Sequence, residues 1–286
     1  MNRIDRRLLF TSGAAAALLA ATGVSAQAAP RRGGRLRAAL SGASRTDHWC
    51  VSEGMFMQAA RGAVYETLTE ISGDGTLRGD IAQSWETADG GRTWAFDTNT
   101  SVTFHDGIAL QADDVVALFE RHGQLDVSRV ETQGLNRIIV TLNAANQSLP
   151  YQMADPAFAV LPRQAERQTA GIGTGLYQVQ KFQAGQHFIG ARVAEHRKDA
   201  LAGWFDHIEL TATSSDQIRA EALRKGMIDV ADIQALDAYS DPVEYQMLPS
   251  AHKTQQIARR TVGVPNAIGT AWALDNTRMA TRWWMV

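Results

Sequence analysis

The side chains of this sequence that could do chemistry are dispersed, and their spacing matches no motif for catalysis or metal binding. The seven histidines include no pair four residues apart, so the spacing of a helical zinc site is missing. His105-Asp106-Gly107 could place a general base beside a carboxylate, but Asp-Gly is also common turn chemistry, and we favour the turn. Gly171-Ile172-Gly173-Thr174-Gly175 lacks the glycine spacing of a dinucleotide loop, so we interpret it as a structural turn.

Cysteine and paired carboxylates add no catalytic constellation. Cys50 is the single cysteine, which excludes an internal disulfide, and the sequence places no histidine or asparagine convincingly beside it as partners of a nucleophile. Asp113-Asp114 precedes an apolar pattern, where carboxylates interact favourably with a helix dipole. The sequence therefore predicts a protein that is not an enzyme and has no cofactor or metal.

Aromatic residues are more informative. Trp49 follows Asp47 and His48 in a polar segment, and an exposed ring there would suit a ligand site because it adds contact area at low entropic cost. Simple packing of Trp49 in the core is the alternative. The terminal pair Trp283-Trp284 would suit the core, an interface or an adhesive end.

The composition is that of a globular protein. The chain has 286 residues, of which 45% are hydrophobic and 20% charged, so disorder along the whole chain is excluded. The net charge is −2, and the absence of a basic excess argues against nucleic acid as a partner.

The first residues have the pattern of an export signal. Arg3, Arg6 and Arg7 precede an uncharged run from Leu8 to Ala26, and Ala26-Gln27-Ala28 matches a cleavage site. Adjacent arginines before the apolar run resemble a twin-arginine signal, and an uncleaved anchor helix is the alternative. We expect residues 1–28 to be removed near Ala28 and the mature protein to be periplasmic.

The rest of the chain alternates short strands and helices. Apolar spacing predicts helices over 55–68, 112–121 and 214–225. Hairpins are predicted around Asp89-Gly90-Gly91 and Gly134-Leu135-Asn136. The mixture indicates an α/β fold, with mixed α+β character. Predicted strands cover 35–40, 81–85, 93–97, 102–104, 130–132, 138–142, 176–182, 188–193, 207–211 and 228–231.

Several motifs, taken in their order along the chain, carry a resemblance to a known family. The chain resembles the family 5 extracellular solute-binding proteins, which serve dipeptide, oligopeptide and nickel ABC importers. Leu176 replaces the proline that is usual in the family's glycine-threonine-glycine motif. The matching stretches are Arg32–Leu40, Tyr65–Leu68, Ile81–Glu86, Asp89–Phe96, Val102–Gly107, Ala112–Val116, Gly173–Tyr177 and Ala222–Val230.

The resemblance implies a type II periplasmic binding protein-like fold whose two lobes enclose a ligand. It implies that lobe I comprises residues 29–50 and 161–236, and that 51–160 form an inserted small α+β domain. The loop after the first strand lines the cleft in the family, so Asp47, Trp49 and Glu53 are the expected ligand contacts. The implied partners are a short peptide or similar small solute and an inner-membrane ABC permease.

The length departs from the family pattern. Family members are roughly twice as long, so residues 237–286 are expected to be the start of a shortened second lobe, or a tail through which a homodimer could form. We expect weak solute affinity from one lobe alone, because pockets usually enclose most of a ligand. The competing hypotheses are a non-transport interaction or sensory protein derived from one lobe, a remnant without a stable product, and, last, a secreted enzyme.

Overall fold

The computed structural model describes residues 32–50, 54–71, 76–199, 201–233, 245–248 and 255–259. The expected signal segment 1–28, the candidate ligand contact Glu53 and the pair Trp283-Trp284 lie outside these ranges. Most of the expected tail 237–286 does so too, and its role in a homodimer stays a prediction. None of the helices in the described part of the chain has the length and apolar character needed to cross a bilayer.

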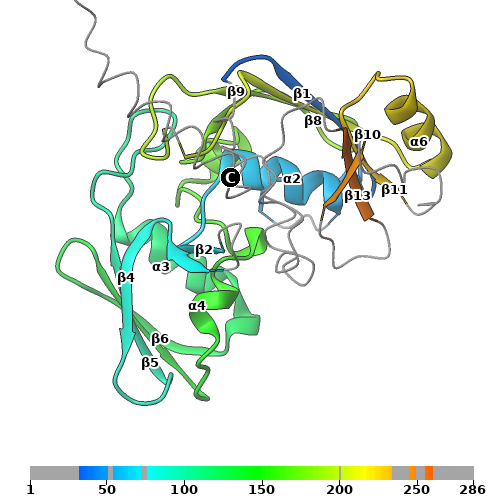
Figure 1. Ribbon diagram of the computed structural model, residues 1–286. Helices are drawn as coiled ribbons and strands as arrows, with labels where there is room; N and C mark the ends of the chain where they lie inside the picture. Colours follow the sequence, from blue (N-terminus) through cyan, green and yellow to red (C-terminus); the bar gives the residue numbers. More distant parts are fainter. Residues whose placement is uncertain are drawn as a thin grey trace, which may run out of the picture. The chain divides into compact units, whose positions relative to one another are not determined.

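A seven-stranded mixed sheet forms the larger of the two main layers (Figure 1). Its strand order is β12-β13-β11-β1-β10-β9-β8. The strands are β1 (Arg35–Leu40), β8 (Tyr177–Gln183), β9 (His187–Arg192), β10 (His207–Ala212), β11 (Val230–Ile233), β12 (Tyr245–Leu248) and β13 (Gln255–Arg259).

The centre of this sheet is parallel. Strand β1 pairs in parallel with β10 on one side and with β11 on the other. Helix α6 (Asp216–Arg224) connects β10 to β11 and carries the chain across β1, as expected for a crossover between parallel strands. The carboxyl ends of these strands therefore meet at one edge, beside the loop that follows β1.

Helix α2 (Met55–Val64) supplies the buried layer next to this sheet. Nine of its ten residues are buried, and its apolar side chains share one core cluster with β1, β8, β9 and β10. The helix is shorter than the predicted 55–68, because Tyr65 has extended backbone angles, φ −118° and ψ 158°, and Thr69 already belongs to a strand.

A separate antiparallel sheet has four strands in the order β4-β5-β7-β6, and we call this sheet, with the helix packed on it, the small domain. Its strands are β4 (Ala82–Thr87), β5 (Thr93–Thr98), β6 (Val127–Gln133) and β7 (Arg137–Leu142), so both predicted hairpins are confirmed. Helix α3 (Ala112–Arg121) packs on this sheet. The side chain of Asp114 accepts a hydrogen bond from the backbone N–H of Gln111, at 2.9 Å, in a capping box.

Short elements complete the described chain. They are β2 (Thr69–Ile71), β3 (Leu77–Gly79), α4 (Leu149–Gln152), α5 (Ala165–Thr169) and the 3₁₀ turns Gly123–Leu125 and Pro156–Phe158. The strand predicted over 102–104 is wrong: only an isolated bridge joins Thr103 to Ala109, because the chain turns back at Gly107, whose φ is +80°.

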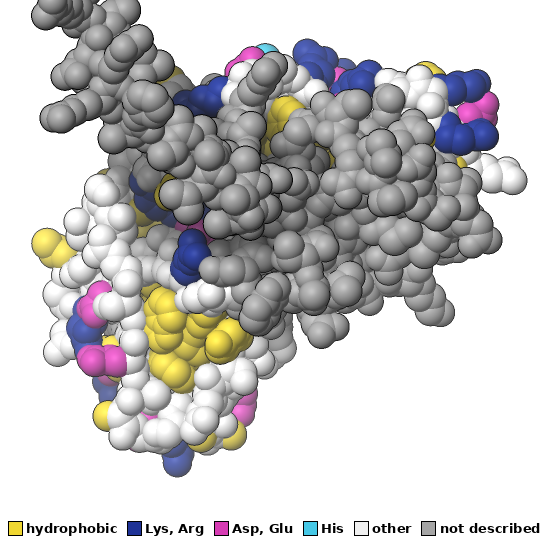
Figure 2. All heavy atoms as spheres, in the orientation of Figure 1, with side chains coloured by type: hydrophobic (Ala, Val, Ile, Leu, Met, Phe, Trp, Pro, Cys, Tyr) yellow, Lys and Arg dark blue, Asp and Glu magenta, His cyan; other side chains and the backbone are white. Residues whose placement is uncertain are grey.

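The two larger of the three core clusters among the described residues divide the chain near residue 66. Residues 55–65 pack with the large sheet, whereas the small-domain cluster runs from Leu68 to Val160. On the face shown in Figure 2, hydrophobic side chains gather over the small domain and charged side chains are scattered around them. The small domain thus has its own core, and helix α2 belongs to that of the large sheet.

Candidate functional site

The carboxyl end of β1 is tied to β11 by a buried carboxylate. Asp232 is fully buried and accepts a hydrogen bond from the backbone N–H of Ser41 at 2.9 Å and another from its hydroxyl. Arg219 of α6 approaches the same carboxylate to 3.2 Å. Burial raises the pKa of Asp232 above its ordinary value, while Ser41 and Arg219 act in the opposite direction. This contact fixes the strand ends from which the ligand-facing loop departs.

The loop after β1 then turns sharply against helix α2. A Cβ on Gly54 would lie 1.7 Å from the carbonyl oxygen of Gly42, so only glycine permits this close approach. Asp47 closes the loop, because its carboxylate accepts a hydrogen bond from the backbone N–H of Ser44 at 2.8 Å. Asp47 is only 7% exposed.

Trp49 packs among aromatic rings of the large-sheet core. Its ring centroid lies 4.6 Å from that of Phe182, 5.7 Å from Tyr65 and 6.0 Å from Phe188. The structure thus places Trp49 in the core, which was the alternative to a ligand contact, and Asp47 holds the loop that carries it. Their roles as ligand contacts, and that of Glu53, stay predictions.

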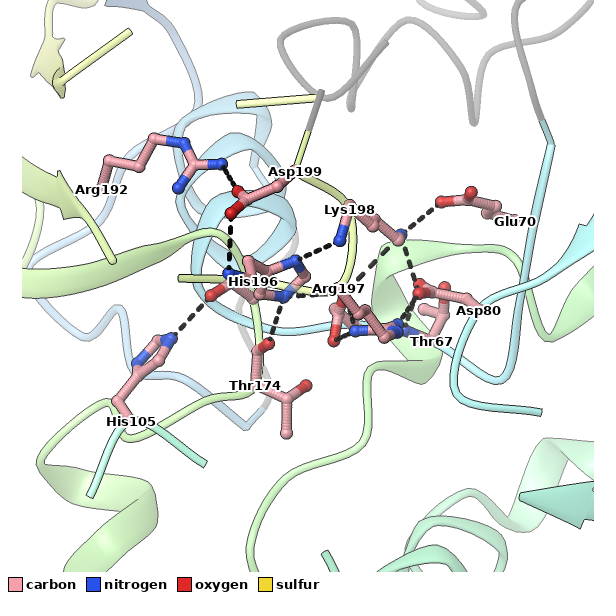
Figure 3. A network of polar contacts seen from close by, with 12 residues as sticks. Thr67, Glu70, Asp80, His105, Thr174, Arg192, His196, Arg197, Lys198 and Asp199 are labelled. Carbon is pink, nitrogen blue, oxygen red and sulfur yellow. Dashed lines mark hydrogen bonds and ion pairs between the residues drawn. The ribbon is translucent and has the colours of Figure 1, made fainter. Parts of the chain in front are cut away.

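A buried network of charges lies where the segment after α2 meets the loop after β9 (Figure 3). Glu66 and Asp80, whose side chains are fully buried, face Arg197 and Lys198. Arg197 donates to both carboxylate oxygens of Glu66, at 2.5 and 2.7 Å, and also pairs with Asp80. Lys198 lies 2.7 Å from Asp80 and 2.6 Å from Glu70.

Mutual attraction explains why these buried groups stay charged. Burial alone would lower the pKa of Arg197, but Glu66 and Asp80 together raise it above its ordinary value. A buried ion pair of good geometry is costly to break even where it adds little net stability. The network therefore joins the base of the small domain to the large sheet. Sequence reasoning missed it, and the charged triplet His196-Arg197-Lys198 was the available signal.

A cavity of about 710 Å³, lined by both polar and apolar groups, lies next to this network. Its walls come from three loops, and it includes both a histidine from the predicted turn and residues of the charged triplet. Gly173 lies at the base of one loop, where a Cβ would be 2.0 Å from the carbonyl oxygen of Val64. The lining residues are Ser101, Val102, Thr103, Phe104, His105, Gly107, Thr174, Gly175, Val193, Glu195, His196, Arg197 and Asp199.

The two histidines of the cavity have both ring nitrogens engaged. In His105, Nδ1 accepts from the N–H of Gly173 at 3.3 Å and Nε2 donates to the carbonyl of Gly175 at 2.8 Å. His196 likewise accepts from the N–H of Lys198 at 3.1 Å, and its Nε2 lies 3.0 Å from the carbonyl of Thr174. Both rings thus stabilise loops in the neutral form.

The turn interpretation of His105-Asp106-Gly107 agrees with these contacts. Asp106 accepts two hydrogen bonds from Arg167, at 2.8 and 3.0 Å, and does not hold the imidazole. The guanidinium of Arg167 also lies 4.4 Å from the centre of the Phe104 ring, a cation–π contact. Within the described ranges, no group of three or more His, Cys, Asp or Glu side chains could hold a metal ion.

We expect the neutral His105 to make stability depend on pH. Burial lowers its pKa below the ordinary value, although the Gly175 bond and Glu66 act against this. As the pH falls, the imidazole takes up a proton in the unfolded chain before it does so in the folded chain. The stability contributed by neutral His105 is therefore fully present above about pH 6.5 and is lost at lower pH. The unfolding midpoint should therefore fall less between pH 7 and pH 5 in His105→Gln than in the natural chain, as measured by thermal melts. An equal fall in the two proteins would contradict this.

Comparison with known proteins decides the family. The family model described as bacterial extracellular solute-binding proteins, family 5 Middle, matches residues 76–264, which is more than half of the chain. The chain belongs to this family. The sequence resemblance and the expected mixed α/β, periplasmic binding protein-like fold are thereby confirmed.

Individual family 5 relatives support the same assignment. The nickel-binding periplasmic protein of Escherichia coli is 24% identical over 244 residues, which cover 76% of this chain and 46% of that protein. Two solved structures share the fold. The binding protein AgaA of A. tumefaciens R10, in complex with agropinic acid, has a TM-score of 0.67 at 20% identity and matches 76% of this chain and 48% of its own.

The second structure is the periplasmic binding protein DppA of Helicobacter pylori, in complex with the peptide STSA. Its TM-score is 0.65 at 19% identity, and the match covers 77% of this chain and 51% of that chain. This family 5 chain therefore spans about half the length of the relatives that it matches.

Proposed function

We propose that this chain is the periplasmic substrate-binding component of an ABC importer, or its lobe I part, and that it receives a short peptide or a related small solute. Family membership over residues 76–264 is the observation that carries the proposal. The relatives named above are binding proteins, two of which are described with the peptide STSA or agropinic acid bound. An inner-membrane permease would take the solute from this chain.

The topology indicates where the solute would sit. In open α/β sheets, ligands bind outside the carboxyl ends of the strands, in the crevice where the connections from two adjacent strands run to opposite sides of the sheet. Here that point is β1, between the parallel neighbours β10 and β11. The loop after β1, which holds Asp47 and Trp49, is therefore the proposed solute-facing wall.

A thermal melt of the full chain tests this function. The melt is recorded alone, with a pool of di- to pentapeptides, with nickel–histidine complexes, and with agropinic acid. A ligand at ~100 times its dissociation constant adds about 2.7 kcal/mol, so we expect the midpoint to rise by roughly 5–10 °C with one solute class. A cooperative melt that responds to no class would contradict the proposal.

A further inference from the structure

A second group of buried and half-buried polar side chains lies at the ends of α2 and α3, and its two arginines form no ion pair with any described carboxylate. It consists of Arg61 and Tyr65 at the end of α2 and Arg121 and His122 at the end of α3, and we call it the cationic cluster. Among the residues that the structure describes, each of its members has a buried polar atom without a hydrogen-bond partner: Nε of Arg61, the hydroxyl of Tyr65, an Nη of Arg121 and Nε2 of His122. Arg61 is 4% and Tyr65 1% exposed.

The members of the cationic cluster lie within electrostatic reach of one another. Burial and the charges of Arg121 and Arg61 lower the pKa of His122 to about 4. Burial also lowers the pKa of Arg61 below its ordinary value, and Arg121 adds to that effect. Cys50, in the same loop as Trp49, is near enough to influence Arg61, Arg121 and Tyr65. The Tyr65 ring also lies 5.7 Å from the ring of Trp49, so the cluster adjoins the proposed solute-facing loop.

No carboxylate among the described residues forms an ion pair with Arg61 or Arg121. The guanidinium of Arg61 donates to the backbone carbonyl of Ala157 at 2.9 Å. Asp155 is electrostatically favourable to Arg61, but its carboxylate accepts from the N–H of Ala157 at 2.9 Å. Elsewhere the chain neutralises buried cations, as Glu66 and Asp80 do for Arg197.

The helix dipoles stabilise Arg61 and Arg121, but not by enough to offset the cost of burying them unpaired. Arg61 and Arg121 each lie in the last turn of a helix, where a cation is favoured by less than the burial of an unpaired charge costs. A buried donor without a partner is destabilising. An occupant that supplies oxygen acceptors and negative charge would remove both costs.

We propose that the cationic cluster binds the anionic group, a carboxylate or a phosphate, of the solute. The proposal rests on the proposed function and names the substrate class: an anionic solute. Arg61 and Arg121 offer guanidinium forks suited to oxyanions, and the Tyr65 hydroxyl is a further donor. The ring of Phe158 lies 4.9 Å from that of His122, edge to face, and holds the imidazole in place.

Thermal melts of the full chain with simple oxyanions test the proposal. The probes are succinate and inorganic phosphate at tens of millimolar, against sodium chloride of equal ionic strength and against the uncharged dimethyl succinate. We expect succinate, phosphate or both to raise the midpoint by several degrees, and the one that acts identifies the anionic group. Arg61→Gln and Arg121→Gln should each abolish the shift, and Arg61→Lys should retain part of it.

Arg129→Gln is the matched control, because Arg129 is exposed on β6 and pairs with Glu131; its shift should equal that of the natural chain. No shift with either anion, or a shift that survives both Arg61→Gln and Arg121→Gln, would overturn the proposal. A neutral, terminally blocked peptide that stabilises the chain equally in Arg61→Gln would overturn it and leave the proposed function intact.

Nuclear magnetic resonance gives a second readout, the titration of the histidine rings with and without the anion. If the cationic cluster has only a structural role, the added anion should leave the titration of His122 unchanged. A bound anion near His122 should raise its pKa from about 4 toward the ordinary range, because negative charge favours the imidazolium. The remaining histidines serve as references in the same sample. An anion that stabilises the chain without moving the His122 titration would place the binding elsewhere.

Discussion

Glu66→Ala is expected to lower the free energy of unfolding by about 3–5 kcal/mol, the range for removing one partner from a buried ion pair. The side chain of Glu66 is fully buried and receives two hydrogen bonds from Arg197, while Lys198 lies 3.6 Å away. Its removal leaves these cations with Asp80 and Glu70 and takes away the acceptor that fixes Arg197. Urea denaturation, followed by circular dichroism, measures the loss.

Glu131→Ala is the control for this variant. Glu131 is half exposed on β6 and pairs with Arg129 at 2.5 Å, and an exposed pair is worth at most about 1 kcal/mol. A similar small loss in Glu66→Ala would show that the buried network does not hold the small domain to the large sheet.

Trp49→Ala is the second large effect, with an expected loss of about 3–5 kcal/mol, as for other buried aromatic residues truncated to alanine. The ring is 2% exposed, and three aromatic rings surround it. Removing it would leave a cavity beside Gly171, where an added Cβ would lie 2.8 Å from the indole nitrogen. The midpoint of urea denaturation measures the loss, and Tyr151→Ala, at a half-exposed ring, should change it by under about 1 kcal/mol.

Trp49→Phe separates packing from solute contact. Phenylalanine keeps an aromatic ring in the cluster, so most of the stability should remain. If Trp49 also contacts the solute, as the sequence predicts, the affinity for the stabilising solute will fall in Trp49→Phe while the unfolding midpoint changes little. Unchanged affinity would leave Trp49 as a core residue alone.

Local patterns in the sequence predicted most elements of the sheets. The strand over 35–40 is observed at Arg35–Leu40 and the helix over 112–121 at Ala112–Arg121. Glycine turns predicted the hairpins, because their positive φ values and spacing are local properties. Ser215 caps α6 by accepting a hydrogen bond from the N–H of Ile218 at 3.3 Å.

Long-range contacts account for what the sequence did not predict. Glu66 and Arg197 are 131 positions apart, and no periodic pattern connects them. Helix α2 ends early, at Val64, because Tyr65 and Glu66 make contacts with other elements. These contacts outweigh the helical spacing of the apolar residues. The short helices α4 and α5 have four and five residues, too few for a periodic signal.

The candidate site was predicted only as a region. The resemblance placed the ligand contacts in the loop after β1, and the structure shows how that loop is held by Ser44, Asp47 and the buried Trp49. The cationic cluster was not predicted, since Arg61 and Arg121 look like ordinary residues of a helix C-terminus. Their unpartnered atoms become evident only when the two helices are brought together.

Hydrogen exchange of the full chain, with and without the solute that most raises its melting midpoint, tests the central claim most directly. We predict slower exchange in residues 41–50, the proposed solute-facing wall, and in 55–65, which carry Arg61 and Tyr65 of the cationic cluster. Exchange should be unchanged at the exposed turn 133–137 of the small domain, where Leu135 is 89% exposed. Protection that is absent from 41–50 and 55–65, or that appears only around 133–137, would contradict a solute site at the carboxyl end of β1.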